Sequence, residues 1–246
     1  MVTTPAAAPE PQPPVNHLGQ MFGALFSPKA TFEDIAKRPS WVAPIVLFTL
    51  LGIVAGALIA QRTDWRSFFQ RQNENNSRLA QAPPEQKERV LETQLKFAPI
   101  SSYAFGALGP VLVVLVLTLV YWGAFNLFNG AGLNYGASFA ITAHAYVPSL
   151  IASVLVIITI FLKQPGEIDP EHLLATNLGA FLADDAPKWL QSLGSSLELF
   201  WIWFLALLAI GFAAANPKKI KPASAFGVVF GLWLLWVLIK VGWVAL

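Results

Sequence analysis

The chain has 246 residues, of which 55% are hydrophobic and only 12% are charged, and its formal net charge at pH 7 is +2. About a quarter of the residues in an average soluble domain are charged, so this composition excludes an ordinary soluble domain and indicates an integral membrane protein. Cysteine is absent, which excludes disulfides, thiolate catalysis, and zinc or iron–sulfur sites held by cysteine.

The first 40 residues combine a proline-rich tail with short amphipathic segments. Residues 1–16 hold five prolines and no basic residue, a composition that predicts a disordered tail rather than a signal peptide. In residues 17–40, apolar side chains recur at helical spacing, and Ser27 followed by Pro28 is typical of a helix start. We expect two amphipathic juxtamembrane helices here, lying either in the lipid headgroup region or against the loops.

Residues 41–246 form the predicted membrane domain, which contains five apolar segments. About 20 residues at about 1.5 Å per residue cross a hydrocarbon core of about 30 Å, so each segment predicts a transmembrane helix. Gly52 and Gly56 in the first segment, and Gly227 and Gly231 in the last, form GxxxG pairs that allow a neighbouring helix to approach closely. The predicted spans are residues 41–60, 103–128, 139–162, 197–215 and 224–245.

Two polar segments, residues 61–102 and 163–196, interrupt the apolar pattern and predict helices outside the membrane. In the first, apolar residues at helical spacing on both sides of Pro83 and Pro84 predict a helical hairpin. Its mixed charges are typical of a solvated face and indicate no nucleic-acid site. In the second, residues 169–171 and 184–187 predict helix starts, and the adjacent acids at 184 and 185 are weak evidence for a divalent metal.

The stretch between the second and third spans, residues 129–150, is predicted to organise the fold. Its glycines at positions 130, 132 and 136 allow a tight turn without charged residues. His144, Tyr146 and Pro148 then place polar or helix-weakening groups in an apolar helix, so we expect them to face protein rather than lipid. Pro148 cannot donate a backbone hydrogen bond, which predicts a bend in the third span and a free carbonyl at His144.

The sequence predicts no enzyme, no catalytic residue, no cofactor and no metal site. The three histidines lie on different segments without paired ligand spacing, and no P-loop, GxSxG or dinucleotide fingerprint is present. The candidates for structural or functional roles are therefore residues in or beside the spans. These are Asn126, His144, Tyr146, Pro148 and Glu198.

These polar residues have two interpretations. They can form interhelical hydrogen bonds, worth about 0.6 kcal/mol each on average in membranes, or they can line a polar pathway, since ionisable groups inside a membrane are expensive. Glu198 lies in the first turn of the fourth predicted span, where the helix dipole by itself favours a carboxylate.

Charge in the short loops predicts the orientation of the chain. Five spans place the two termini on opposite sides of the membrane. Lys218, Lys219 and Lys221 have no acidic neighbour in the shortest basic loop, where the positive-inside bias is strongest. We therefore predict a cytoplasmic N-terminus, although the raw count of basic residues over all loops favours the opposite orientation.

Three groups of residues, taken in order, form a recognisable set of motifs. They are Phe26-Ser27-Pro28 with Phe32 and Ile35, Phe139 with Ala145-Tyr146-Val147-Pro148, and Leu197-Glu198-Leu199-Phe200-Trp201 with Ala209-Ile210-Gly211. The set resembles bacterial members of the Yip (Ypt-interacting protein) domain family, over about residues 18–246. The resemblance implies a five-span, all-α protein of a bacterial inner membrane. Eukaryotic members interact with Rab-type GTPases in the early secretory pathway, partners that a bacterial chain lacks, and bacterial members have no settled biochemical role. The family often has Asp at the position of Glu198.

Two classes of function follow. The first is a non-enzymatic scaffold or membrane-organising protein that contacts the lipid bilayer and partner transmembrane helices or a second copy of itself. The second is a small oligomeric transporter or channel, which requires Asn126, His144 and Glu198 to converge on one cavity. An inverted repeat would favour the transporter, and none is visible, because five spans do not divide evenly.

Overall fold

The protein is all-α, as the sequence predicts. The computed structural model describes residues 16–74, 76–183 and 185–245, so the tail predicted for residues 1–16 lies outside the described residues except for Asn16. Every regular element in the described part is helical, and the β-bridge found there, between Asn177 and Glu198, is isolated.

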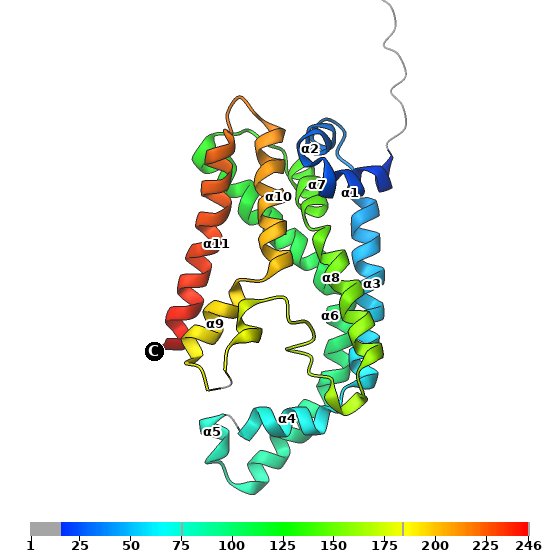
Figure 1. Cartoon of the computed structure of the whole chain (residues 1–246), viewed down its shortest axis with the longest axis vertical. Coiled ribbons are helices and arrows are strands. Elements are labelled where there is room, and N and C mark those ends of the chain that lie inside the picture. Colours follow the sequence, from blue (N-terminus) through cyan, green and yellow to red (C-terminus); the bar gives the residue numbers. More distant parts are fainter. Residues whose placement is uncertain (1–15, 75, 184, 246) are drawn as a thin grey trace, which may run out of the picture.

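Long helices that alternate in direction make up most of the molecule (Figure 1). Figure 1 shows α1, α2 and the α10–α11 loop at one end, called here the amino end, and α4, α5 and α9 at the other, called the hairpin end. In chain order the elements are α1 (His17–Phe26), α2 (Pro28–Lys37), α3 (Val42–Arg62), α4 (Trp65–Glu74), α5 (Ser77–Ala80), α6 (Pro84–Asn129), α7 (Tyr135–Ala145), α8 (Pro148–Leu162), the 3₁₀ turns η1 (Pro165–Glu167) and η2 (Leu178–Phe181), α9 (Lys188–Ser196), α10 (Leu199–Ala215) and α11 (Pro222–Ala245).

Three helices in the described ranges, α3, α6 and α11, are long and apolar enough to cross a membrane. The pair α7 and α8 makes a fourth if it is counted as one span, bent by 42°. The remaining apolar helix, α10, has 17 residues, which is about 25 Å at 1.5 Å per residue and therefore shorter than a hydrocarbon core of about 30 Å. The five-span count thus stays a prediction.

One continuous helix joins the predicted helical hairpin to the second predicted span. Helix α6 runs without a break over 46 residues, about 70 Å at 1.5 Å per residue. Its polar first part and its apolar second part are one helix, because intrahelical hydrogen bonds satisfy the backbone equally well in water and in lipid. The rise in hydropathy along α6 marks the change from polar to apolar side chains, and the backbone needs no break at that point.

The second polar segment is largely irregular, so the helix start predicted at residues 169–171 is wrong. The carboxylate of Asp169 accepts from the N–H of Glu171 at 2.9 Å, and its carbonyl accepts from the N–H of His172 at 3.1 Å. These bonds close a turn, an alternative that Asp side chains offer to a helix. The second predicted start agrees with α9, which begins directly after Pro187; Asp184 lies outside the described residues.

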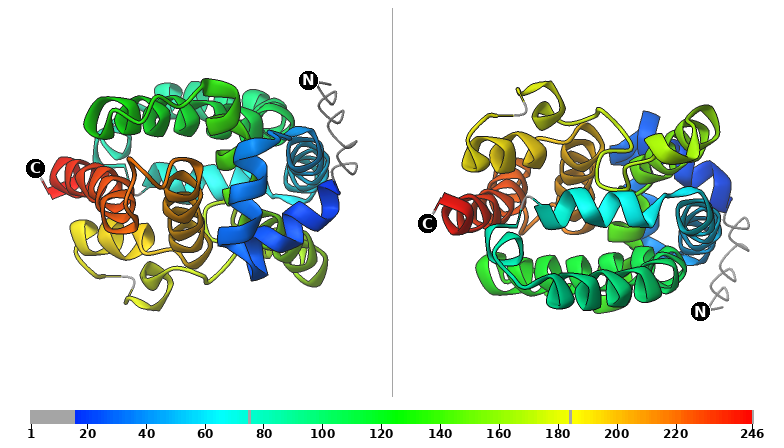
Figure 2. Two further views of the ribbon diagram at one scale, coloured as in Figure 1. Left: turned by 90° about the horizontal axis from the view of Figure 1, so that it is seen from above. Right: turned by 90° about the horizontal axis from the view of Figure 1, so that it is seen from below.

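Helix α2 packs into the helical core, which neither sequence interpretation anticipated. Phe32 and Ile35 on α2 are fully buried against the core around α10. A Cβ on Gly211 of α10 would lie 2.6 Å from Cγ2 of Ile141 on α7 and 3.1 Å from the ring of Phe32. Only glycine permits this three-way contact, and Figure 2 shows α1 and α2 (blue) covering the amino end of the bundle.

Helix α1 differs from α2, because it leaves one apolar face uncovered. Leu18, Phe22 and Phe26, spaced four residues apart, are 59%, 64% and 78% exposed, while Met21 and Ala24 face the protein. This exposed apolar face therefore fits the first of the two positions expected from the sequence, in which the helix lies in the lipid headgroup region.

The two GxxxG pairs have different surroundings. A Cβ on Gly52 would lie 2.2 Å from the carbonyl oxygen of Gly106 on α6, and one on Gly56 would lie 2.4 Å from the carbonyl oxygen of Ser102. At Gly227 and Gly231 a Cβ would meet no atom within 4 Å. The first pair thus allows α3 and α6 to touch, and the second makes no close contact within the chain.

This difference predicts unequal effects of adding one methyl group. Gly52→Ala should lower the free energy of unfolding by about 1–3 kcal/mol, because the helices must move apart to fit the methyl group. Gly227→Ala is the matched control and should be neutral or stabilising by up to about 1 kcal/mol, since alanine favours helices more than glycine. Unfolding by SDS titration in mixed micelles, followed by circular dichroism, measures both; equal effects would contradict the packing described here.

Candidate functional site

The polar residues predicted in the third span lie in and just after α7, the most enclosed helix of the molecule. Residues 137–145 of this helix are all buried, and α2, α6 and α10 pack around it. The helix ends at Ala145, and α8 begins with Pro148 at its first position. The bend predicted from Pro148 is therefore confirmed, and it lies at residues 146–147.

The backbone at this bend is satisfied locally. The N–H of Tyr146 donates to the carbonyl of Thr142 at 3.0 Å, and the N–H of Val147 donates to the carbonyl of His144 at 3.2 Å. The prediction of a free His144 carbonyl is wrong, because a tighter i to i+3 bond replaces the one that Pro148 cannot make.

The buried side chains around the bend bond to their own helices rather than across helices. Nδ1 of the fully buried His144 lies 2.9 Å from the carbonyl of Ala140, so this nitrogen carries the proton and donates, while Nε2 has no partner. Thr142 likewise donates to the Ser138 carbonyl at 2.9 Å, and Thr118 to the Val114 carbonyl at 2.6 Å. Interhelical hydrogen bonds are one of the two interpretations of these residues, and Thr118, Thr142 and His144 form none with the described residues.

Tyr146 joins three helices through aromatic contacts. Its ring lies 5.1 Å from that of Phe48 on α3 and 5.4 Å from that of Phe204 on α10, both edge to face, and 6.5 Å from that of Trp201. Edge-to-face pairs at these separations are each worth about 0.5–1.5 kcal/mol beyond simple burial. The bend at residues 146–147 thus directs one large ring into the centre of the helix packing.

Asn126 closes the turn that precedes α7. Its Oδ1 accepts from the N–H of Leu133 at 2.8 Å, and its Nδ2 donates to the carbonyl of Leu133 at 3.1 Å. The turn needs left-handed backbone at Gly130 and Gly132, whose φ angles are 54° and 63°, a conformation that glycine adopts readily. Asn126 therefore has a structural task in this turn.

The same turn is tied to the loop that connects α10 and α11. Nδ2 of Asn216 donates to the carbonyl of Ala131 at 2.9 Å, and Nδ2 of Asn129 donates to the hydroxyl of Ser224 at 2.7 Å. These bonds hold the two connections together at the amino end, on the side that the sequence predicts to be cytoplasmic.

Glu198 is the N-cap of α10. Its Oε1 accepts from the N–H of Phe200 at 3.1 Å, and its Oε2 accepts from the N–H of Trp201 at 2.6 Å. Backbone bonds between residues 176–178 and 197–199 hold the cap in place. A carboxylate at this position satisfies N–H groups that have no partner inside the helix and complements the helix dipole.

Glu198 also lines a cavity of about 250 Å³ at the hairpin end, between α9, α10 and α11. Neither Asn126 nor His144 lines this cavity, so the structure does not bring the three predicted residues together. Sequence reasoning missed the other charged group of the cavity, Lys240, although it is the sole charged residue in the predicted span 224–245. The lining residues are Ser195, Ser196, Glu198, Trp201, Trp233, Trp236, Val237 and Lys240.

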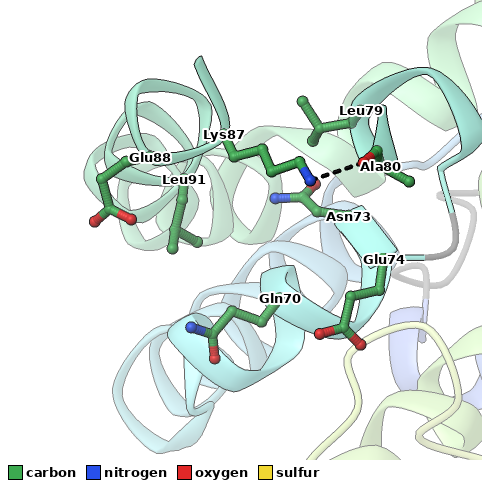
Figure 3. Close-up of a pocket in the computed structure, with 8 residues that line it drawn as sticks. All are labelled: Gln70, Asn73, Glu74, Leu79, Ala80, Lys87, Glu88 and Leu91. Carbon is green, nitrogen blue, oxygen red and sulfur yellow. Dashed lines mark hydrogen bonds between the residues drawn. The ribbon is translucent and has the colours of Figure 1, made fainter. Parts of the chain in front are cut away.

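A second cavity, of about 320 Å³, lies outside the apolar region between α4, α5 and the start of α6 (Figure 3). Gln70 and Glu74 of α4 face Lys87 and Glu88 of α6 across it, and Nζ of Lys87 donates to the carbonyl of Ala80 at 2.7 Å. In the part of the chain that the structure describes, no group of three or more His, Cys, Asp or Glu residues is placed to hold a metal. This cavity lies on the hairpin that the sequence predicts to be outside the membrane.

The fold and the apolar helices define the chain as an all-α integral membrane protein. The profile described as the Yip1 domain matches residues 22–246, so the chain belongs to the Yip1 domain family, which confirms the predicted resemblance. The chain is also similar to the membrane protein YknW of Bacillus subtilis (strain 168), with 24% identity over 214 residues that cover 86% of this chain and 85% of that protein. No solved structure matches the chain.

One acid at the amino end predicts a dependence of stability on pH. Hydrogen bonds from Arg38 and from Gln20 lower the pKa of Asp34 below its ordinary value of 3.8 and connect α2 to α1. Because the folded-state pKa is the lower one, the contribution is complete above pH 3.8 and is lost as the pH falls through the depressed value. Thermal unfolding between pH 6 and pH 2 should show this loss in the wild type, mostly below pH 3.8, and a smaller one in Asp34→Asn. Equal pH dependence in the two proteins would refute the role of Asp34.

Proposed function

We propose that this Yip1 domain protein is a non-enzymatic scaffold that organises a bacterial inner membrane through lipid and partner helices. The observation that carries the proposal is the separation of its polar residues. Asn126 closes a turn, His144 bonds within α7, and Glu198 caps α10. A transport pathway needs such groups in one cavity, whereas here each has a structural partner in a different part of the molecule.

The outer surface of the membrane domain supports the same proposal. Large apolar side chains on α11 are half exposed or more, including Leu235, Trp236 and Leu238 at 53%, 64% and 60%. Such a surface requires lipid or another apolar helix around it. Gly227 and Gly231 leave room on this helix for close approach of a partner helix or a second copy of the chain.

Glu198→Gln tests the proposal against transport. Glutamine keeps one oxygen acceptor at the N-cap, so the free energy of unfolding should fall by about 1 kcal/mol or less, through the lost dipole interaction. Liposomes that contain the wild-type protein should pass protons, sodium and potassium no faster than empty liposomes. Flux through the wild type that Glu198→Gln abolishes and the control variant Glu171→Gln retains, with unfolding unchanged in both, would refute the scaffold proposal.

The proposed orientation places the amino end in the cytoplasm, and the absence of native cysteine makes it directly testable. Ala223→Cys lies at the amino end and Gln81→Cys at the hairpin end, and both positions are exposed. An impermeant thiol reagent applied to intact cells with a permeabilised outer membrane should label position 81 and not position 223. The reverse pattern would show that the hairpin end is cytoplasmic.

A further inference from the structure

The cavity between α9, α10 and α11 holds a lysine without an acidic partner. Nζ of Lys240 lies 3.2 Å from Oγ of Ser195, 3.3 Å from Oγ of Ser196 and 3.4 Å from the carbonyl oxygen of Ser192. No ion pair of Lys240 with a described carboxylate is formed. Charge-assisted hydrogen bonds are ordinarily about 2.7–2.9 Å long, so the serines position the ammonium group while leaving it able to bind a stronger acceptor.

The same cavity holds one fixed negative charge. The two N–H groups at the start of α10 hold the carboxylate of Glu198, and this carboxylate lines the cavity without pairing with Lys240. The cavity therefore offers a positive and a negative group that are both fixed and separate. Such an arrangement is complementary to a ligand that carries a negative and a positive group of its own, and the carboxylate disfavours a ligand that is only negative.

The walls and the depth of the cavity indicate where this ligand comes from. Trp201, Trp233 and Trp236 line it, and tryptophan is enriched at the membrane surface, where its faces can also hold an ammonium group by cation–π attraction. Lys240 follows Trp236 by one helical turn toward the hairpin end, which places its charge at headgroup depth. The volume of about 250 Å³ is below the 300–1,000 Å³ of pockets that enclose whole ligands, so it suits a headgroup whose acyl chains remain in the bilayer.

We propose that this cavity binds the headgroup of a zwitterionic phospholipid of the phosphoethanolamine class. The phosphate oxygens bind the ammonium group of Lys240, and the ethanolamine ammonium lies toward Glu198 and the tryptophan faces. The acyl chains leave along the apolar surface of α11, next to the exposed Trp236. This site does not depend on the scaffold proposal, since a transporter could carry it equally well.

Native mass spectrometry of the full chain in mild detergent, after removal of bound lipid, tests the proposal. Dioleoyl phosphatidylethanolamine should bind at least about tenfold more tightly than dioleoyl phosphatidylglycerol. Lys240→Met should weaken binding of the ethanolamine lipid by about tenfold or more, as expected for the loss of one charge-assisted hydrogen bond. Glu198→Gln should abolish the preference between the two lipids. Equal affinity of the wild type for both lipids would overturn the proposal.

Three further measurements keep the test decisive. Lys188→Met removes an exposed lysine from α9 outside the cavity and should leave lipid binding unchanged. Circular dichroism shows whether Lys240→Met folds. If it does not fold, Trp236→Leu serves in its place, because it changes an exposed residue of the cavity wall and should reduce the preference for the ethanolamine lipid over the glycerol lipid. Soluble glycerophosphoethanolamine at millimolar concentration should not displace the lipid; if it does, the ligand is a free phosphate compound and the lipid proposal fails. Unchanged binding in folded Lys240→Met also overturns it.

Discussion

The contact of Gly211 with Phe32 and Ile141 is the constraint on which the centre of this protein depends. It brings α2, α7 and α10 to one point, and α7 is thereby removed from lipid over residues 137–145. Lipid offers no hydrogen bonds, so a helix that carries Ser138, Thr142 and His144 is stable at membrane depth only if protein surrounds it. A side chain at position 211 would separate the three helices and expose those polar groups.

This enclosure explains why the polar residues bond to their own helices. Side chains such as Thr142 and His144 reach the carbonyl one turn back without help from a neighbour, so the packing between helices is left to apolar and aromatic groups such as Tyr146. The result is a helix α7 whose buried hydroxyl groups and Nδ1 of His144 bond to carbonyls of the same helix or its N-cap and are not linked into a chain. Ion pathways need linked groups, which is the physical basis for preferring a scaffold.

Features set by local chemistry were predictable from the sequence, and those set by long-range contact were not. The apolar helices, the bend at Pro148 and the acid at the start of α10 follow from neighbours within a few residues. The burial of α2 depends on a glycine 179 positions after Phe32, and no local pattern indicates it. The cavity lysine, Lys240, had a visible signal as a lone charge in an apolar span, but its meaning came only from α9, which the fold places beside it.

The hairpin end carries two separate features, the cavity lined by Glu198 and Lys240 and the charged hairpin of α4 and α5. The cavity lies between α9, α10 and α11 and is the site proposed for a lipid headgroup. Helix α6 continues past the apolar part of the molecule, because its 46 residues exceed any bilayer thickness, and Figure 1 shows α4 and α5 beyond α9. If the cavity binds a lipid headgroup as proposed, the hairpin of α4 and α5 remains a separate charged surface at the same end of the molecule. Two separate surfaces would allow lipid and a protein partner to bind at the same time, which is the property that the proposed scaffold requires.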